Sequence, residues 1–270
     1  MNHVPSTTHV GTGAFARPAE QRSAAAPGST RCGFLLAAAI LLTTPCSHQH
    51  ATSAEPKPTA FGAAIVESSG GKQTAQTGSL LPQPVVVQVN DEQGTAVAGA
   101  LVEFSAVPGV TFDPSSGLTD SSGQVTTSVS LGGMSGRYQI VASTTNKSHK
   151  KVELKLEEIA LGYRQTLGRR LNDQYCERCH NPESTVERVS NYDNLEIKPH
   201  PFSEGETLNK ISDADLTAII SHGGPALNKS ALMPAWGNTL SKADIQALIS
   251  YIRAVSDPPS RSAGPVFAKN

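Results

Sequence analysis

The hydrophobic pattern of this chain changes its period once, near residue 158, and this change divides the chain into two folding units. From Phe61 to Leu156 apolar residues recur at every second position, most clearly in 85–89 and 151–157. This period is typical of strands that bury one face. Short turn sequences rich in Gly, Pro, Asp and Ser separate the runs. We therefore expect a β-sandwich over residues 60–158.

The pattern after residue 158 is helical and predicts an all-α unit over residues 160–257. Residues 163–175 read as one helix. Ser212 and Ser241 are each followed by an aspartate three positions later, the spacing of a helix N-terminal capping box. The last helix has one apolar stripe, formed by Ile245, Leu248, Ile249 and Ile252. These few helices give a small core for their length, unless another group fills it.

The N-terminal residues read as an export signal. A nine-residue apolar run, 34–42, follows Arg31 and precedes small residues at 52–54. Such a run is too short to span a bilayer, which takes about 20 residues, and its flanks are those of a secretory signal. The alternative is a buried helix stub. Cys46 is a weak candidate for a lipid anchor because Pro45 precedes it.

These features give a domain plan and a location. Residues 1–54 are a signal peptide with an N-terminal extension, 55–59 a linker, and 258–270 a disordered tail after Pro258-Pro259. The mature chain has no expected transmembrane span and is placed in the periplasm or at the cell surface. Association with a membrane or cell surface stays open.

Composition excludes several classes of function. The formal net charge is −1, and both predicted folded units are mildly acidic, so nucleic acid is not an expected partner. Aromatic residues make up 5% and charged residues 17% of the chain, which disfavours one large α/β enzyme. The sequence shows no set of residues typical of a catalytic site that acts on a substrate. We therefore expect a protein that is not itself an enzyme.

The pentapeptide Cys176-Glu177-Arg178-Cys179-His180 carries the chemistry. Two thiols one helical turn apart can bond to both vinyl groups of one haem, and the adjacent histidine can ligate its iron. Three alternatives are weaker. A structural zinc site needs about four ligands and lacks a second cysteine pair, a thioredoxin-like pair lacks its βαβ setting, and a disulfide would close a tiny loop.

A second axial ligand is expected farther along the chain. Met233 is the one methionine outside the leader and the predicted sandwich, and the following Pro234 stiffens its backbone. The alternatives are a core methionine that fills a gap and His222 as the distal ligand. His222 is better explained as a helix-terminal residue, and His200, between two prolines, as a solvated loop residue.

The β-rich region resembles the bacterial Ig-like group 1 domains of invasin and intimin. The resemblance covers roughly residues 60–158 and rests on four stretches in the same order: 81–91, 94–104, 119–124 and 136–142. It implies a fold and no activity. One copy is found here, whereas the family often stacks several.

The helical region resembles class I cytochrome c over roughly residues 160–257. Gly168 stands where the family lets its first and last helices cross, opposite Leu248 and Tyr251. Trp236 matches the aromatic residue near the haem edge, and Trp236 and Pro234 are expected to pack in the haem pocket. An insert around 192–206 departs from the family pattern. The fold class is thus multidomain, with an all-β Ig-like sandwich followed by an all-α cytochrome domain.

The expected function is that of an exported monohaem cytochrome. It would carry single electrons through one covalently bound haem c, with Cys176 and Cys179 as attachment sites and His180 and Met233 as axial ligands. Its partners would be redox proteins, and the Ig-like module would be a spacer or docking arm. Two alternatives are an electron-transfer subunit of a periplasmic oxidoreductase complex and a surface adhesion protein with an accessory haem domain.

Overall fold

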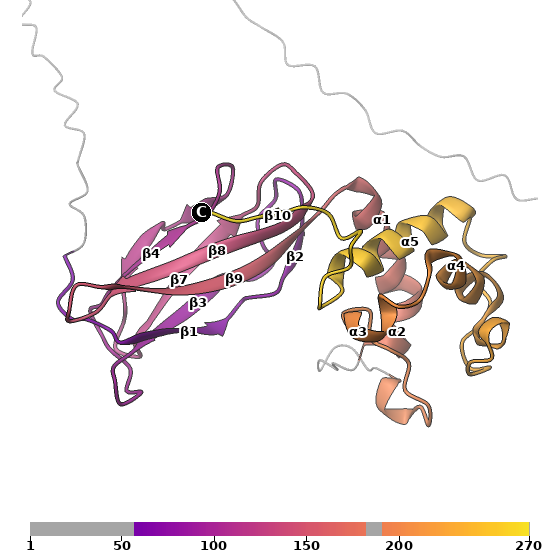
Figure 1. Cartoon of the computed structure of the whole chain (residues 1–270), viewed down its shortest axis with the longest axis horizontal. Helices are drawn as coiled ribbons and strands as arrows, with labels where there is room; N and C mark the ends of the chain where they lie inside the picture. The colour runs from indigo at the N-terminus through magenta and orange to yellow at the C-terminus, as the bar shows by residue number, and fades with distance from the viewer. Residues whose placement is uncertain (1–56, 182–190, 270) are drawn as a thin grey trace, which may run out of the picture. The chain divides into compact units, whose positions relative to one another are not determined.

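The computed structural model of the chain describes residues 57–181 and 191–269 (Figure 1). These residues belong to one compact unit. The predicted signal segment 1–54, with Cys46, lies outside the described residues. Within the described part, no helix is long and apolar enough to cross a membrane.

Residues 60–161 form the β-domain, whose strands make two sheets that enclose one apolar core. One sheet has the order β1-β3-β7-β5 and the other the order β2-β9-β8-β4-β6, with β10 added beside β8. The strands are β1 Ala64–Ser69, β2 Thr74–Gln76, β3 Val85–Asn90, β4 Leu101–Ser105, β5 Thr111–Asp113, β6 Ser116–Leu118, β7 Gln124–Ser130, β8 Gly136–Thr145, β9 Lys151–Leu161 and β10 Val266–Phe267.

The alternation seen in the sequence is confirmed in these strands. In β3 the side chains of Val85, Val87 and Val89 are fully buried, and the residues between them are partly exposed. Strand β9 alternates in the same way along its first half and then becomes buried on both faces. Both sheets contribute to one core, which contains Val102 and Ile140 from the second sheet together with the valines of β3. The period-two pattern therefore reports real burial.

The boundary between the two folding units is sharper than predicted. Strand β9 continues to Leu161, and helix α1 begins at Tyr163, so Gly162 alone separates them. Strands β8 and β9 pair over ten residues each, from Gly136 opposite Ala160 to Thr145 opposite Lys151. The first helix therefore starts from a strand that is already held along its full length.

Residues 162–257 form the helical domain, within which residues 182–190 are not described. Its elements are α1 Tyr163–Leu171, a π-helical turn Asn172–Cys176, α2 Glu177–His180, a 3₁₀ turn Tyr192–Asn194, α3 Gly205–Leu208, α4 Asp213–His222, a 3₁₀ turn Gly224–Leu227 and α5 Lys242–Val255. The two predicted N-caps are confirmed, since Ser212 Oγ accepts from the N–H of Asp215 and Ser241 Oγ from that of Asp244.

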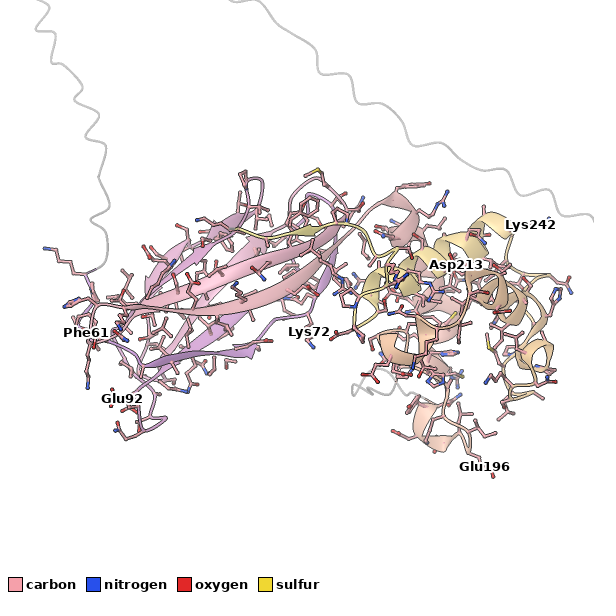
Figure 2. All side chains as sticks on the ribbon, in the orientation of Figure 1. Phe61, Lys72, Glu92, Glu196, Asp213 and Lys242 are labelled. Atoms are coloured by element: carbon pink, nitrogen blue, oxygen red, sulfur yellow. The ribbon has the colours of Figure 1, made fainter. Side chains whose placement is uncertain are left out.

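A buried arginine joins the last helix to the start of α4. Arg253 is 6% exposed, and its guanidinium donates to the carbonyl of Leu208 at 2.6 Å and to the carboxylate of Asp213 at 2.8 Å. Figure 2 labels Asp213 at this point. A charge so deeply buried is tolerated because all its contacts are hydrogen bonds to oxygen.

The residues after α5 differ from the disordered tail that we expected. Val266 and Phe267 form strand β10, which runs parallel to β8 and pairs with Arg137 and Tyr138. The rings of Phe267 and Tyr138 lie 4.7 Å apart. Strand β4 pairs with residues 141–143 of β8, so β10 pairs with a stretch that β4 does not reach. A non-local strand of two residues has no period that the sequence could reveal.

One carboxyl group lies in the β-domain without a charge partner. Glu158 of β9 is 0% exposed, and its Oε2 accepts from the N–H of Gln73 at 2.7 Å. Its Oε1 has no partner within the described residues. Burial raises the pKa of Glu158 to about 8, because removal from water disfavours the charged form.

We predict that Glu158 makes the β-domain less stable as the pH rises. Its pKa is higher in the folded than in the unfolded chain, so its contribution is full below about pH 4 and is lost as the pH rises through 8. The free energy of unfolding should fall by at most about 1.4 kcal/mol per pH unit from this one proton. Urea denaturation at pH 5, 7 and 9 should show a flatter profile for Glu158→Gln. The exposed control Glu92→Gln should keep the wild-type profile, and equal slopes in all three proteins would contradict the prediction.

Candidate functional site

The cysteine motif lies at the end of the first helical segment, where the helix changes type. The sequence predicts one helix over 163–175, but α1 ends at Leu171 and a five-residue π-helical turn, Asn172–Cys176, follows. Such turns rotate the following side chains relative to the helix before them and are frequent at functional sites. Cys176 is buried, Cys179 is partly exposed, and both are free thiols.

The position of this segment depends on a close crossing of α1 and α5. A Cβ atom placed on Gly168 would lie 2.1 Å from the carbonyl oxygen of Ala247 and 2.7 Å from Cβ of Tyr251. Only glycine allows the two backbones to approach so closely. The expected role of Gly168 as the contact point between the first and last helices is confirmed by this geometry.

His180 is the residue whose chemistry the structure defines most fully. Its Nδ1 lies 2.9 Å from the carbonyl oxygen of His200. Because a carbonyl can only accept, Nδ1 carries the proton and Nε2 keeps its lone pair. Burial lowers the pKa of His180, which favours the neutral imidazole. A neutral ring with a free Nε2 is the form that ligates a metal ion.

An apolar cluster brings the predicted site residues together. Cys176 belongs to the buried core of the helical domain, and Met233 and Trp236 pack against that core from the α4–α5 connection. The ring of Trp236 lies 5.2 Å from that of Tyr175, the residue before Cys176. Residues separated by some 60 positions thus share one apolar environment. Burial in it raises the pKa of the Cys176 thiol to about 12.

Backbone hydrogen bonds fix the segment that carries Met233. The N–H of Gly224 donates to the carbonyl of Met233 at 3.1 Å, and the N–H of Trp236 donates to the carbonyl of Ile220 at 2.9 Å. The side chains of Met233 and Trp236 are partly buried against the core of the helical domain. Pro234, which we expect to pack in the haem pocket, is exposed in this structure.

The side chains of this region fit a c-type haem by the chemistry of their donors. Two free thiols lie three positions apart at the end of one helical segment. One neutral imidazole has an available Nε2, and one thioether packs against the same core as Cys176. Cys176, Cys179, His180 and Met233 are the residues that could hold the group. His222, the rival ligand, is exposed at the end of α4.

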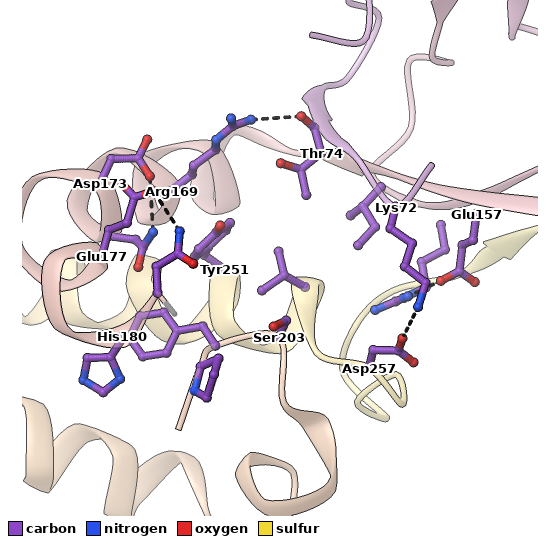
Figure 3. A pocket seen from close by; sticks show the side chains of 17 residues that line it. Lys72, Thr74, Glu157, Arg169, Asp173, Glu177, His180, Ser203, Tyr251 and Asp257 are labelled. Carbon is purple, nitrogen blue, oxygen red and sulfur yellow. Dashed lines mark hydrogen bonds and ion pairs between the residues drawn. The ribbon is translucent and has the colours of Figure 1, made fainter. Parts of the chain in front are cut away.

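A separate cavity of about 560 Å³ has His180 in its wall. Figure 3 shows it, with Asp173 and Glu177 near His180 and with Lys72 paired to Asp257. The Lys72 Nζ to Asp257 carboxylate distance is 3.0 Å. Among the described residues, the wall of this cavity carries charges of both signs. It includes neither cysteine of the motif nor Met233. This polar cavity borders the apolar cluster, because Phe202 lines the cavity and also packs against the cluster.

Sequence reasoning missed the residues that contact the His180 ring. The carbonyl of His200 and the ring of Phe202 both reach it, from a segment that we had described only as an insert. His200 is exposed, as expected of a loop residue. His200 contacts His180 through its backbone oxygen. Every residue type has this atom, so the sequence could not reveal the contact. The Pro-His-Pro-Phe stretch, with its stiffened backbone, was the available hint.

Comparison with known proteins agrees with the helical part of this description. Residues 164–252 match the family model described as "Cytochrome C oxidase, cbb3-type, subunit III". The helical domain therefore contains a cytochrome c domain, which implies haem c as the cofactor and electron transfer as its role. No curated protein sequence matches the chain significantly.

Among solved structures, the chain is similar to two structures of intimin domains and to one of a bacterial adhesin. It shows 16% identity to the D00–D0 domain of intimin, covering 40% of this chain and 51% of that one, with a TM-score of 0.29. The D0–D1 domain of intimin shows 19% identity, covers 38% of this chain and 49% of that one, and gives a TM-score of 0.30. The Yersinia pseudotuberculosis adhesin InvE shows 14% identity, covers 37% of this chain and 32% of that one, and gives a TM-score of 0.26. The chain thus spans about half the length of the intimin structures. TM-scores this low support no argument about the fold, so we describe the fold of the β-domain from its own strand order.

We predict that Gly168→Ala destabilises the helical domain. Alanine is intrinsically the better helix former by about 1 kcal/mol, so propensity alone would raise stability. The clash with the Ala247 carbonyl should outweigh this and lower the free energy of unfolding by about 1–3 kcal/mol. Urea unfolding of the helical domain measures the sign. Arg164→Ala, an exposed change on the same helix, is the control, and a stabilised Gly168→Ala protein would disprove the close crossing.

Proposed function

We propose that this chain is an exported monohaem c-type cytochrome that carries single electrons. One observation supports this above the others: a Cys-x-x-Cys-His motif whose histidine donates from Nδ1 to a carbonyl, which leaves the lone pair on Nε2, and has a pKa that is lowered by burial. The motif lies within the residues that match a cytochrome model. Export is part of the proposal, since haem c is attached outside the cytoplasm.

In this proposal each residue has one role. Cys176 and Cys179 would hold the group through thioether bonds, and His180 and Met233 would ligate its iron. When bound, haem c would supply a one-electron ferric–ferrous couple. Trp236 and the apolar cluster around Cys176 keep water away from the ligands, which strengthens local electrostatic interactions. Two axial protein ligands leave no open position for a substrate.

The β-domain serves, in this proposal, as an Ig-like spacer or docking arm. Electron-transfer partners dock transiently over small areas, typically less than about 1,200 Å². A second candidate function is that of a haem-bearing subunit in an oxidoreductase complex. The description of the matching family, which names an oxidase subunit, favours this candidate. Affinity purification of the full chain distinguishes the two, because a subunit would bring a stoichiometric oxidoreductase with it.

Covalent attachment gives the first test of the proposal. The full chain, expressed with an intact c-type maturation system, should retain haem on a denaturing gel. Cys179→Ser should lose normal double attachment and show a red-shifted ferrous absorption band with reduced yield. Cys46→Ser, which lies outside the motif, should stain like the wild type. A colourless wild-type protein would contradict the proposal. Full yield with an unshifted band in Cys179→Ser would show that Cys179 forms no thioether bond.

The distal ligand gives the second test. Met233→Ala should keep its covalent haem, bind CO in the ferrous form, and lower the reduction potential by on the order of 100 mV, since axial ligands span about 0.8 V. Met134→Ala is the matched control, because Met134 is 61% exposed in the β-domain. Spectroelectrochemistry and CO titration measure both effects. If neither property changes in Met233→Ala, the distal ligand is another residue.

A further inference from the structure

We propose that Phe202 is a positioning residue for His180, and that it limits the rotation of the imidazole about its Cβ–Cγ bond. This inference deepens the proposed function and rests on it. Phe202 lies in the 192–206 segment, which the resemblance to class I cytochromes c does not explain. Two contacts from that segment reach the His180 ring, and they restrain it in different ways.

The first contact restrains one edge of the ring. The hydrogen bond from Nδ1 of His180 to the carbonyl of His200 is 2.9 Å long. The imidazole is bonded to Cβ, so its plane turns about the Cβ–Cγ bond, and this rotation moves Nδ1 relative to its acceptor. Because a carbonyl oxygen accepts over a broad range of directions, the hydrogen bond sets the tautomer and restrains the plane but leaves a range of orientations open.

The second contact restrains that rotation. The ring centroids of His180 and Phe202 are 4.7 Å apart, and their planes make an angle of 35°. This spacing lies within the range of aromatic contact. A flat ring at this distance blocks rotation of the imidazole toward it. Phe202 also packs against the core that contains Cys176, so it cannot easily move aside.

The segment that carries both contacts is itself anchored. The N–H of Gly205 donates to the carbonyl of Asp257 at 2.9 Å, and the N–H of Asp257 donates to the carbonyl of Ser203 at 2.8 Å. A carboxylate oxygen of Glu204 accepts from the N–H of Thr207 at 3.2 Å, at the start of α3. A Cβ on Gly205 would lie 2.3 Å from the carbonyl oxygen of Pro258. The loop therefore holds Phe202 from the residues that follow it.

The plane of an axial imidazole affects the electronic state of ferric haem, so orientation has a direct spectroscopic readout. In the full-length holoprotein, Phe202→Leu removes the flat face and keeps an apolar side chain, whereas Phe202→Tyr keeps the ring. Ile211→Val is the matched control, because Ile211 packs against the same core and makes no ring contact with His180 among the described residues. Low-temperature electron paramagnetic resonance of the ferric proteins gives the g values, and redox titration gives the potential.

We expect the largest g value and the potential to shift in Phe202→Leu and to stay at wild-type values in Phe202→Tyr and Ile211→Val. Wild-type values in Phe202→Leu would overturn the inference, as would an equal shift in Ile211→Val. A Phe202→Leu chain that attaches no haem, while Ile211→Val matures normally, would assign Phe202 to folding and also overturn it. Failure of the proposed function differs from all of these, because the wild type would then carry no covalent haem.

Discussion

The close approach of α1 and α5 at Gly168 is the contact on which the site depends. It brings a helix backbone against the carbonyl of Ala247, and the position of α1 is then set from both directions. On one side α1 follows directly from β9, with Gly162 between them. On the other it continues through the π-helical turn to Cys176. The place of the cysteine motif is therefore a consequence of backbone packing.

The environment of the motif is divided between an apolar and a polar side. Cys176, Met233 and Trp236 share the apolar core of the helical domain, whereas His180 also faces a cavity lined by charged groups. Burial lowers the pKa of His180 and so favours the neutral imidazole, whereas the hydrogen bond from Nδ1 to the carbonyl of His200 raises that pKa and sets the tautomer. In a site of this kind the protein contributes ligands and a low dielectric environment, and the redox chemistry comes from the cofactor.

Features encoded by local pattern could be predicted from the sequence. Alternation in 85–89 predicted β3, and the Ser-x-x-Asp spacings predicted the starts of α4 and α5. The haem chemistry that the motif Cys176–His180 indicates stays a prediction. Features that depend on tertiary contact could not be predicted. The π-helical turn interrupts an unbroken helical pattern, and the carbonyl of His200 has no residue-type signal.

The pairing of β10 with β8 makes the helical domain, in topological terms, an insertion within the second sheet. The chain leaves that sheet after β9, forms the helices, and returns to the sheet at Val266. Until the residues after the helices are in place, then, part of β8 keeps free backbone donors and acceptors. Unpaired edges of this kind invite misassembly with other chains. Completion of the second sheet thus requires that the chain has passed through the helical domain, which couples the folding of the two halves.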